Sequence, residues 1–463
     1  MEFKQTTNFE LFDIVLNNDP EELKAAEFVN LKGWVRTNRD NGSIGFVEFN
    51  DGSYFKNVQL VYTSECKNYE VVNKLKTGSA ISVNGKLKLT PENKQPFEIE
   101  IIECELLGDV EDDYPLQKKR HSFEFLRDIA HLRPRANTFQ AVFRVRNALS
   151  VAIHEFFQQR GFIYVHTPLI TTNDGEGAGN VFDVTTHDTK DPYSFYNHKV
   201  NLTVTGQLHV EPFALAFRDV YTFGPAFRAE HSNTVRHASE FWMVEPEMAF
   251  TDLNGNMDII EDCVKFCIEY VERACPEEMK FFNEMIDKTL LDRLHHVLNS
   301  EFKRVSYTEG IEILQKAVQN GHKFENNNIF WGMDLQSEHE RYLTEEIVKG
   351  PLFLTDYPKD IKAFYMRQND DGKTVAAVDL LVPAVGELVG GSQREERYDV
   401  LKKKMDELGI TKELDWYLDT RRYGGCYHSG FGIGFDRLLM YVTGMQNIRD
   451  VQPYPRTSNN IKY

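Results

Sequence analysis

Hydrophobic and polar positions divide the chain into two parts with different periods. In residues 26–107, Gly, Asn, Asp and Pro separate short runs typical of strands: EFVNLKGWVRT, SIGFVEFND, FKNVQLVYT, SAISVNGKLKL and PFEIEIIECELL. From about Thr138 the apolar positions recur instead with the helical period of about 3.6 residues. The first part is therefore predicted to be a small all-β barrel, and the second to begin with a helix.

The second part mixes helices with strands. Its first helix is predicted over 138–160, with Gly161 as the C-cap and one apolar face made by Val142, Val145, Leu149, Ile153 and Phe156. Further helices are predicted over 257–275, 278–300, 308–319, 395–409 and 434–443, and strands in FIYVHTPLI, PLFLTDYP, KAFYMR, AAVDLLVP and GELVGGSQR. This mixture predicts an α+β fold rather than a regular βαβ alternation.

A polar and charged stretch, GDVEDDYPLQKKR (108–120), lies between the two parts and is typical of a linker. We therefore expect a barrel domain with an N-terminal extension over 1–107, a hinge over 108–135 and a larger domain over 136–463. A chain of 463 residues is long enough for two or three domains.

Composition and charge exclude several classes of protein. A formal net charge of −18 argues against a protein that coats nucleic acid nonspecifically, although residues 117–146 are locally basic. The chain has neither a long apolar run nor the pattern of a signal peptide at its start, so a cytoplasmic location is expected, with no membrane partner. None of its six cysteines forms a CxxC pair, which argues against structural zinc.

The first segment that can carry chemistry is FGPAFRAEHSNTVRHASEFWMVEPEMAF (223–250). Its flanks are predicted to form two strands of a hairpin around a basic loop. Such a hairpin can aim Arg228 at a phosphate, because the guanidinium fork matches phosphate oxygens, and Phe241 can offer a flat face to a base. The alternative is a surface arginine over a core aromatic.

Two further segments add glycines, an arginine and acids. In HSGFGIGFDRLLMYVTG (428–444), three glycines allow close approach of a ligand, and Arg437 falls in the first turn of an apolar helix. In VDLLVPAVGELVGGSQR (378–394), Asp379 and Glu387 lie in apolar strands. Magnesium prefers such oxygen ligands beside a triphosphate, while the alternative is that the acids cap strands or pair with arginines.

Together, these segments and the barrel resemble a class II aminoacyl-tRNA synthetase, most closely the asparaginyl enzymes of the aspartyl, asparaginyl and lysyl subgroup. The resemblance extends from about residue 26 to RDVQPYPRT (449–457). It implies an OB-fold that reads the anticodon, followed by an antiparallel six-stranded sheet flanked by helices. It also implies a homodimer formed through the helix over 138–160, and a helical insertion at about 275–350 with no assigned site.

The resemblance assigns roles around ATP by position. Arg228 is expected to contact the α-phosphate, and Arg437, with His237, the β/γ end; the two arginines are the expected catalytic residues. Glu230 is expected to accept from the adenine amino group, and Phe241 to stack on the base. Mg²⁺ is expected on Asp379 and Glu387, although Gly390 replaces a serine that is frequent in the aspartyl enzymes.

The same resemblance defines the amino-acid pocket. Glu176 and Gln207 match residues that bind the α-amino group, and Arg394 matches the arginine that binds the side-chain carbonyl. Val210 stands where aspartyl enzymes have a lysine, which removes a cation suited to a carboxylate. Glu245 can accept hydrogen bonds from an amide group, whereas ionised aspartate offers none.

In the barrel, Phe46 matches an aromatic on which an anticodon base stacks, Gln59 matches a reader of the middle base, and Arg36 a nearby basic contact. From its own sequence context, Phe46 would instead be an ordinary aromatic of the barrel core. Glu98 or Glu100 is expected to help read a base edge, with no choice between them.

The resemblance therefore implies an asparagine–tRNA ligase whose partners are ATP, L-asparagine and tRNA(Asn). An aspartyl-tRNA synthetase, discriminating or not, is the nearest alternative. An ammonia-dependent asparagine synthetase is opposed by the barrel. A non-catalytic nucleic-acid-binding paralogue is opposed by the intact set Arg228, Glu230, Asp379, Glu387 and Arg437.

Overall fold

The computed structural model describes the chain except for residues 1, 94, 176–179, 188–189 and 233. The described residues form two compact units, Met1–Ala141 and Val142–Tyr463. The domain limits expected near residues 107 and 136 stay predictions. A helix, α4, and a 3₁₀ turn lie inside the segment expected to be a hinge, at Phe123–Asp128 and Arg133–Arg135.

The first unit contains the expected barrel. Its described strands close in the order β2-β3-β4-β6-β5, with β5 pairing back to β2. Buried and half-buried residues alternate along β3, so that Val47 and Phe49 face the core while Phe46 and Glu48 do not. The strands are β1 (Lys4–Gln5), β2 (Phe28–Asp40), β3 (Gly45–Asn50), β4 (Val58–Tyr62), β5 (Ala80–Leu89) and β6 (Phe97–Gly108), and a short helix, α3, covers Tyr69–Val72.

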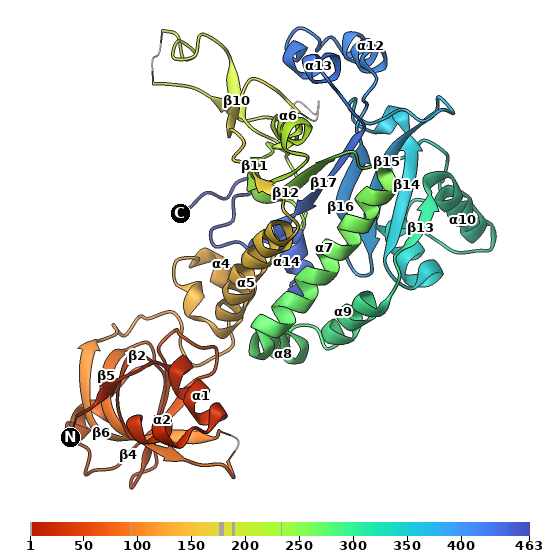
Figure 1. Ribbon diagram of the computed structural model, residues 1–463. Helices are drawn as coiled ribbons and strands as arrows, with labels where there is room; N and C mark the ends of the chain where they lie inside the picture. Colours follow the sequence, from red (N-terminus) through yellow and green to blue (C-terminus); the bar gives the residue numbers. More distant parts are fainter. Residues whose placement is uncertain (1, 94, 176–179, 188–189, 233) are drawn as a thin grey trace. The chain divides into compact units, whose positions relative to one another are not determined.

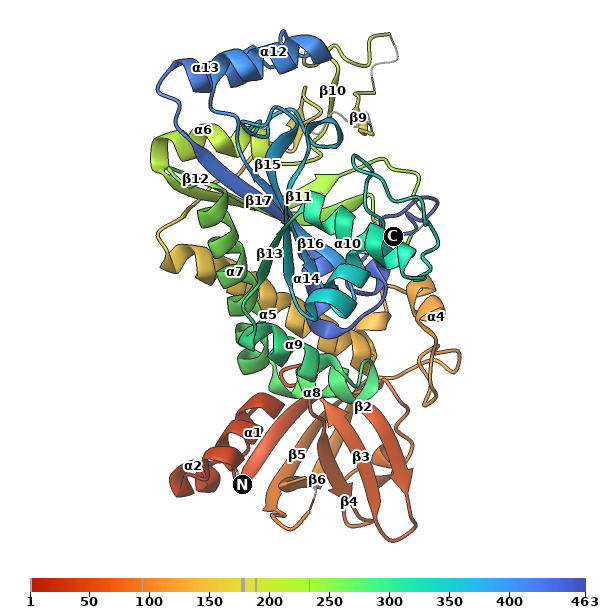
Figure 2. The same cartoon turned by 90° about the vertical axis from the view of Figure 1, so that its right-hand side faces the viewer.

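Two helices that the sequence analysis did not predict, α1 (Asn8–Asn17) and α2 (Pro20–Ala25), lie beside the barrel (Figures 1 and 2). Thr7 and Glu10 form a capping box at the start of α1, which was the sequence signal for this helix. The ring of Phe12 packs 5.0 Å from that of Phe97, so α1 contributes to the barrel core.

The second unit is built on a sheet whose described strands have the order β13-β14-β15-β16-β17-β12-β11-β7. The six central strands are antiparallel, as expected, and the edge strands β13 and β7 add one parallel pairing each. The strands are β7 (Ile163–Tyr164), β11 (Asp219–Phe227), β12 (Glu240–Ala249), β13 (Lys303–Ser306), β14 (Leu352–Pro358), β15 (Thr374–Val382), β16 (Gly386–Gln393) and β17 (His428–Gly434), and a separate small sheet holds β8 (Ile170–Thr171), β9 (Asp183–Val184) and β10 (Val200–Leu202).

Helices flank this sheet. The longest, α5 (Asn137–Gln159), buries the predicted face, and Gly161 follows it with a positive φ of 79°. Figure 1 shows α7 (Leu253–Ala274) lying across the sheet, where it contacts β15, β16 and β17, while α10 (Tyr307–Gln319) packs on β14. The other helices are α6 (Gln207–Phe217), α8 (Pro276–Met285), α9 (Leu290–Asn299), α11 (Ser337–Arg341), α12 (Tyr398–Leu408), α13 (Asp415–Arg422) and α14 (Phe435–Thr443), with a π-helix at Tyr342–Val348.

Three predicted elements were wrong. KAFYMR is a loop, because Phe364 and Tyr365 are buried in the cluster that includes residues of α12 and α13 and do not alternate along a strand. The helix expected over 278–300 is two helices, α8 and α9, with Asp287 accepting from the Thr289 N–H between them. The strand expected over 162–170 is reduced to β7 and the start of β8. The insertion is also not wholly helical, because it supplies β13.

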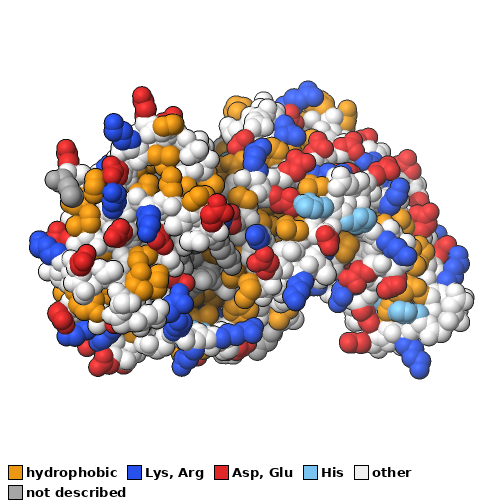
Figure 3. Space-filling view, turned by 90° about the horizontal axis from the view of Figure 1, so that it is seen from below, with side chains coloured by type: hydrophobic (Ala, Val, Ile, Leu, Met, Phe, Trp, Pro, Cys, Tyr) orange, Lys and Arg blue, Asp and Glu red, His pale blue; other side chains and the backbone are white. Residues whose placement is uncertain are grey.

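On the face drawn in Figure 3, acidic and basic side chains are interspersed with exposed hydrophobic side chains. Within the described residues, no helix combines the length and the apolar character needed to cross a membrane.

Candidate active site

A cavity of about 540 Å³ opens over the central strands of the second unit. It gathers residues that lie up to 243 positions apart in sequence, since it is lined by both Thr205 and Ile448. The site residues expected from the sequence that line it are Gln207, Arg228, Glu230, His237, Phe241, Glu245, Asp379, Glu387, Arg394 and Arg437. Glu176 lies outside the described residues, and the three expected anticodon contacts belong to the first unit.

The hairpin of β11 and β12 places the first arginine and the aromatic. Phe227 pairs with Glu240, so the described residues between them form the connecting loop. Arg228 is held at its start, because its N–H donates to the Ser239 carbonyl at 3.0 Å. The Arg228 guanidinium lies 5.3 Å from the centre of the Phe241 ring. A flat ligand and an anionic group can therefore bind side by side here.

The loop and α14 add further polar groups. His237 Nε2 lies 3.9 Å from a Glu230 carboxylate oxygen. Burial and the charge of Arg437 lower the pKa of His237, so the neutral imidazole is favoured. Arg437 stands in the first turn of α14, whose N-cap is Gly434, and its side chain lines the cavity. Arg437 supplies the positive charge suited to phosphates at this end, and the neutral His237 adds a hydrogen-bonding group beside it.

Acidic residues gather at another part of the cavity. Asp379 pairs with Gly390 across β15 and β16, and a Cβ on Gly390 would lie 3.4 Å from both Asp379 Oδ1 and Glu387 Oε1. A third acid, Glu340 on α11, accepts from the Glu387 N–H at 3.2 Å. Burial and the charge of Glu387 raise the pKa of Glu340 to about 7. Converging carboxylate oxygens of this kind fit a hard divalent cation.

Two cations adjoin these acids. Lys362 Nζ lies 2.6 Å from Asp379 Oδ2, and this contact outweighs burial and raises the pKa of Lys362. Arg236 also lines the cavity and donates to the Ser337 hydroxyl on α11 at 3.1 Å. Neither Glu340 nor Lys362 lies in a recognisable local motif, because their positions depend on long-range packing of α11 and of the loop after β14.

The remaining part of the cavity is rich in buried polar groups. Glu245 accepts hydrogen bonds from the Gly206 N–H at 2.8 Å and from the Thr205 hydroxyl. Gln207, the first residue of α6, donates to Glu211 at 3.1 Å. Arg394 is 2% exposed and forms a bidentate pair with Glu247, with both N–O distances 2.9 Å.

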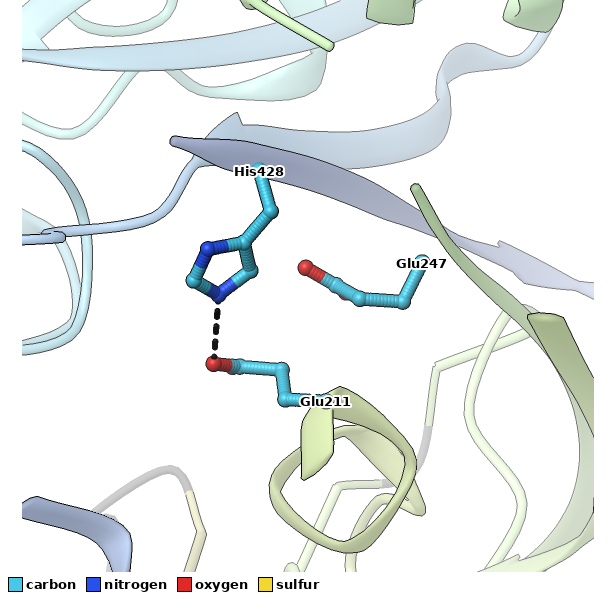
Figure 4. Close-up of side chains that lie close together, drawn as sticks. All are labelled: Glu211, Glu247 and His428. Atoms are coloured by element: carbon cyan, nitrogen blue, oxygen red, sulfur yellow. Dashed lines mark hydrogen bonds and ion pairs between the residues drawn. The ribbon is translucent and has the colours of Figure 1, made fainter. Parts of the chain in front are cut away.

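Behind Arg394 lies a buried cluster of Glu211, Glu247 and His428, which point toward one another from α6, β12 and β17 (Figure 4). Their ligand-type atoms lie within 4.8 Å of one another, as in a metal site. Arg394 already occupies both oxygens of Glu247, and Arg421 and His428 both donate to Glu211. This cluster is therefore a network of ion pairs rather than a set of metal ligands.

Val210 does not face the proposed amino-acid pocket. Val210 is fully buried in an apolar cluster with Val165, Ala214 and Val220, and it is not among the described residues that line the cavity. The next residue of α6, Glu211, instead brings a charge to within 4.0 Å of the Arg394 Nε. In the sequence, Glu211 is marked as an acid inside the otherwise apolar helix QLHVEPFALAF. Glu247 is marked as a second acid, two residues after Glu245.

Gly430 was expected to admit a ligand, but the structure shows a different reason for its small size. A Cβ at this position would lie 2.0 Å from Glu247 Oε2 and 2.6 Å from Arg394 Nη2. The absent side chain therefore makes room for the buried ion pair.

On the barrel, Phe46 and Gln59 lie on one outward face, because Phe46 pairs with Val61 and Glu48 with Gln59 across β3 and β4. Phe46 is half-buried and does not belong to the barrel core, so the alternative of a core aromatic is wrong. Gln59 donates to Glu98 at 3.4 Å, which favours Glu98 over Glu100 as its neighbour. Arg36 occupies a bulge of β2 and donates to the carbonyl of Arg135.

Comparisons with known proteins agree with this geometry. Residues 123–458 match the family of class II tRNA synthetases (D, K and N), and residues 29–107 match the OB-fold nucleic acid binding domain. The asparagine–tRNA ligase of Clostridium acetobutylicum is 58% identical over 447 residues, which cover 94% of this chain and 96% of that relative. The chain belongs to the class II tRNA synthetases, in the asparagine–tRNA ligase family.

Other relatives of this synthetase give the same result. The asparagine–tRNA ligase of Bacillus cytotoxicus is 57% identical, covering 94% of this chain and 96% of that relative. The asparaginyl-tRNA synthetase of Pyrococcus horikoshii, solved with asparaginyl-adenylate, is 33% identical with a TM-score of 0.84, covering 94% of this chain and 96% of that one. This synthetase therefore shares its family's architecture over nearly its whole length.

Proposed function

We propose that this synthetase is an asparagine–tRNA ligase that activates L-asparagine with ATP and transfers it to tRNA(Asn). The observation that carries the proposal is the single cavity that joins Arg228, Phe241 and Arg437 to Glu245 and Arg394. Groups suited to a nucleotide and groups suited to an amide thus line the same cavity, as the formation of an aminoacyl-adenylate requires.

In the first step, a carboxylate oxygen of asparagine attacks the α-phosphorus of ATP. A new P–O bond forms as the bond to the β-phosphate breaks, and pyrophosphate leaves. Arg228 stabilises the charge that develops on the α-phosphate, and Arg437 and His237 bind the leaving phosphates. In the second step, a hydroxyl of the terminal tRNA ribose attacks the carbonyl carbon of the adenylate, and AMP leaves.

Mg²⁺ belongs to the proposal as the metal that Asp379 and Glu387 would hold. The support is their donor set, since both carboxylates approach the point above Gly390 and offer only oxygen ligands. A bound Mg²⁺ would supply positive charge that neutralises the triphosphate. Lys362 pairs with Asp379, the charge of Arg236 lies near Glu340, and Glu340 holds the backbone of Glu387 by accepting its N–H.

The choice of amino acid is proposed to depend on Glu245 and Arg394, with Gln207 and Glu176 on the α-amino group. The Glu245 carboxylate can accept from the amide N–H groups of asparagine and repels the carboxylate of aspartate. Each Glu245 oxygen already accepts one hydrogen bond and keeps acceptor capacity for an amide N–H, whereas the carboxylate of aspartate would meet only its negative charge.

Binding of tRNA is proposed at the barrel, where Phe46, Gln59 and Glu98 share one region of the outer surface. Half-buried Phe46 can stack on an anticodon base, and Gln59 can bond to a base edge. For Arg36 to contact the tRNA, its guanidinium must release the Arg135 carbonyl to which it donates.

A homodimer formed through α5 and the strands that follow it is a further part of the proposal. Several hydrophobic side chains there are more than a third exposed, namely Val151, Ile163, Leu169 and Ile170. A second copy would bury them, and sedimentation at micromolar concentration would give twice the monomer mass. The cytoplasmic location expected from the sequence stays a prediction.

Pyrophosphate exchange with purified enzyme tests the proposal. Asparagine should support exchange in the presence of Mg²⁺ and ATP, and charging should require tRNA(Asn). Faster exchange with aspartate would favour an aspartyl-tRNA synthetase. No adenylate with any amino acid would favour a non-catalytic binding protein.

A further inference from the structure

Arg394 separates the cavity from a layer of buried charge. Its side chain lines the cavity, whereas Glu211 and Glu247 are not among the described residues that do so. Both acids are 0% exposed. Figure 4 shows Glu247 reaching from β12, and Glu211 from α6, into the same space. The acids therefore contact Arg394 from the side away from the substrate.

The closer acid holds Arg394 in one orientation. Nε and Nη2 of Arg394 donate to the two oxygens of Glu247, and Nη1 donates to the Ser392 hydroxyl at 2.7 Å. Nη1 and Nη2 each carry a second N–H that these three bonds do not use, and the Arg394 side chain lines the cavity. This bidentate pairing fixes the plane of the Arg394 guanidinium, and the Glu247 carboxylate opposes its positive charge at contact distance.

The second acid extends the same network. Glu211 accepts from Arg421 at 3.0 Å, from His428 at 3.0 Å and from the Tyr417 hydroxyl at 2.7 Å. Burial disfavours its ionised form, but Arg421 and His428 outweigh burial and lower the pKa of Glu211. An ionised Glu211 also orients Gln207, which donates to it from the cavity wall.

A neutral amide and a carboxylate make different demands on such a pocket. An amide oxygen needs donors but carries no net charge, so the free N–H groups of Arg394 satisfy it. A buried carboxylate needs a cation whose charge is not already opposed. Glu247 opposes the charge of Arg394, and Glu245 adds a negative charge at the cavity wall.

We propose that Glu247, supported by Glu211, determines amide specificity by compensating the charge of Arg394 from behind the pocket. Arg394 is thereby a hydrogen-bond donor rather than a binding site for a carboxylate. Both acids are positioning residues, because they act through Arg394 and Gln207 and line no part of the cavity. The inference rests on the proposed function and names its source of selectivity.

The test compares Glu247→Gln and Glu211→Gln with the wild type in pyrophosphate exchange. The quantity measured is kcat/KM for asparagine divided by kcat/KM for aspartate. Glu247→Gln should lower this ratio by about tenfold or more, because the uncompensated arginine then attracts a carboxylate in a site of low dielectric. Glu211→Gln should lower it less, since its carboxylate lies farther from Arg394.

Glu278→Gln is the matched control. Glu278 is a buried acid on α8 that lies 3.8 Å from Arg144, and it does not line the cavity in the described structure. Its ratio should equal that of the wild type. Unfolded molecules contribute to neither rate, so the ratio does not depend on the fraction of folded enzyme.

A Glu247→Gln variant that loses both activities equally, with an unchanged ratio, would show that the pair is only structural and would overturn the inference. If Glu247→Gln does not fold, an unchanged ratio in Glu211→Gln overturns it instead. A wild type that prefers aspartate would refute the proposed function itself, which keeps the two failures distinct.

Discussion

Lys362 and Asp379 form an ion pair in the wall of the cavity, with Nζ 2.6 Å from Oδ2 and both side chains less than a fifth exposed. The lysine comes from the loop after β14, and the aspartate from β15. This pair places a cation beside Asp379 and near Glu387. The negative charge of these acids is thus partly neutralised by the protein itself.

Replacing Lys362 should make the thermal stability of the enzyme depend on a metal bound by Asp379 and Glu387. Lys362→Met removes a buried partner, a type of change that costs about 3–5 kcal/mol. Thermal unfolding in EDTA should show a lowered Tm, and added Mg²⁺ should raise the Tm of the variant more than that of the wild type. Lys402→Met, which breaks an exposed pair with Asp406, is the control and should change Tm little. Equal responses to Mg²⁺ would argue against a metal at these acids.

Arg437→Ala should abolish pyrophosphate exchange while the fold is kept. The side chain is half-buried at the cavity wall, and its loss removes a cation from the expected position of the phosphates. Removing such a group costs about 100-fold or more in rate. Arg422→Ala, at an exposed pair on α13, controls for loss of charge alone. Exchange at the wild-type rate would refute the role of Arg437.

Two glycines of the same strand should differ in their tolerance of a methyl group. A Cβ on Gly430 would lie 2.0 Å from Glu247 Oε2 and 2.5 Å from the Pro246 carbonyl, so Gly430→Ala must displace the buried ion pair. A Cβ on Gly434 meets only Arg437, at 3.7 Å. Calorimetry should show a lower Tm for Gly430→Ala than for Gly434→Ala. The free energy of unfolding of Gly430→Ala should be lower by about 1–3 kcal/mol or more. Similar Tm values would mean that the pair can move at little cost.

Phe46→Ala should weaken tRNA charging but leave exchange intact, because exchange needs no tRNA. Loss of one base stack corresponds to about 1–3 kcal/mol, which should appear as a higher KM for tRNA. Trp34→Ala is the matched control, since Trp34 is another partly exposed aromatic of the barrel, on β2. If both reactions fell together, Phe46 would have a structural role.

Much of the fold could be predicted because its signals are local. The face of α5 from Val142 to Phe156 and the alternation along β3 follow directly from hydrophobic spacing. The loop KAFYMR was misread, since its apolar side chains are buried by contacts with distant helices. Hydrophobic spacing reports that a residue is buried, but it does not report against which element.

The residues of the candidate site also fall into those predictable from local motifs and those placed only by tertiary packing. Arg228, Asp379 and Arg437 lie in short motifs, so their presence in one cavity was anticipated. Lys362 and Glu340 carry no motif and reach the acids only through the tertiary fold. Val210 was read as part of the pocket, but the turn of α6 directs it into the core and brings Glu211 toward Arg394. Sequence position alone did not determine which of two adjacent helical residues faces the substrate.

The most direct test of the proposed function compares amino acids in ATP–pyrophosphate exchange by the wild-type enzyme with Mg²⁺. Asparagine should support exchange with a kcat/KM at least about 100-fold above that of aspartate, the discrimination expected of a pocket lined by buried polar groups. Exchange that is equal for the two amino acids, or faster with aspartate, would contradict it.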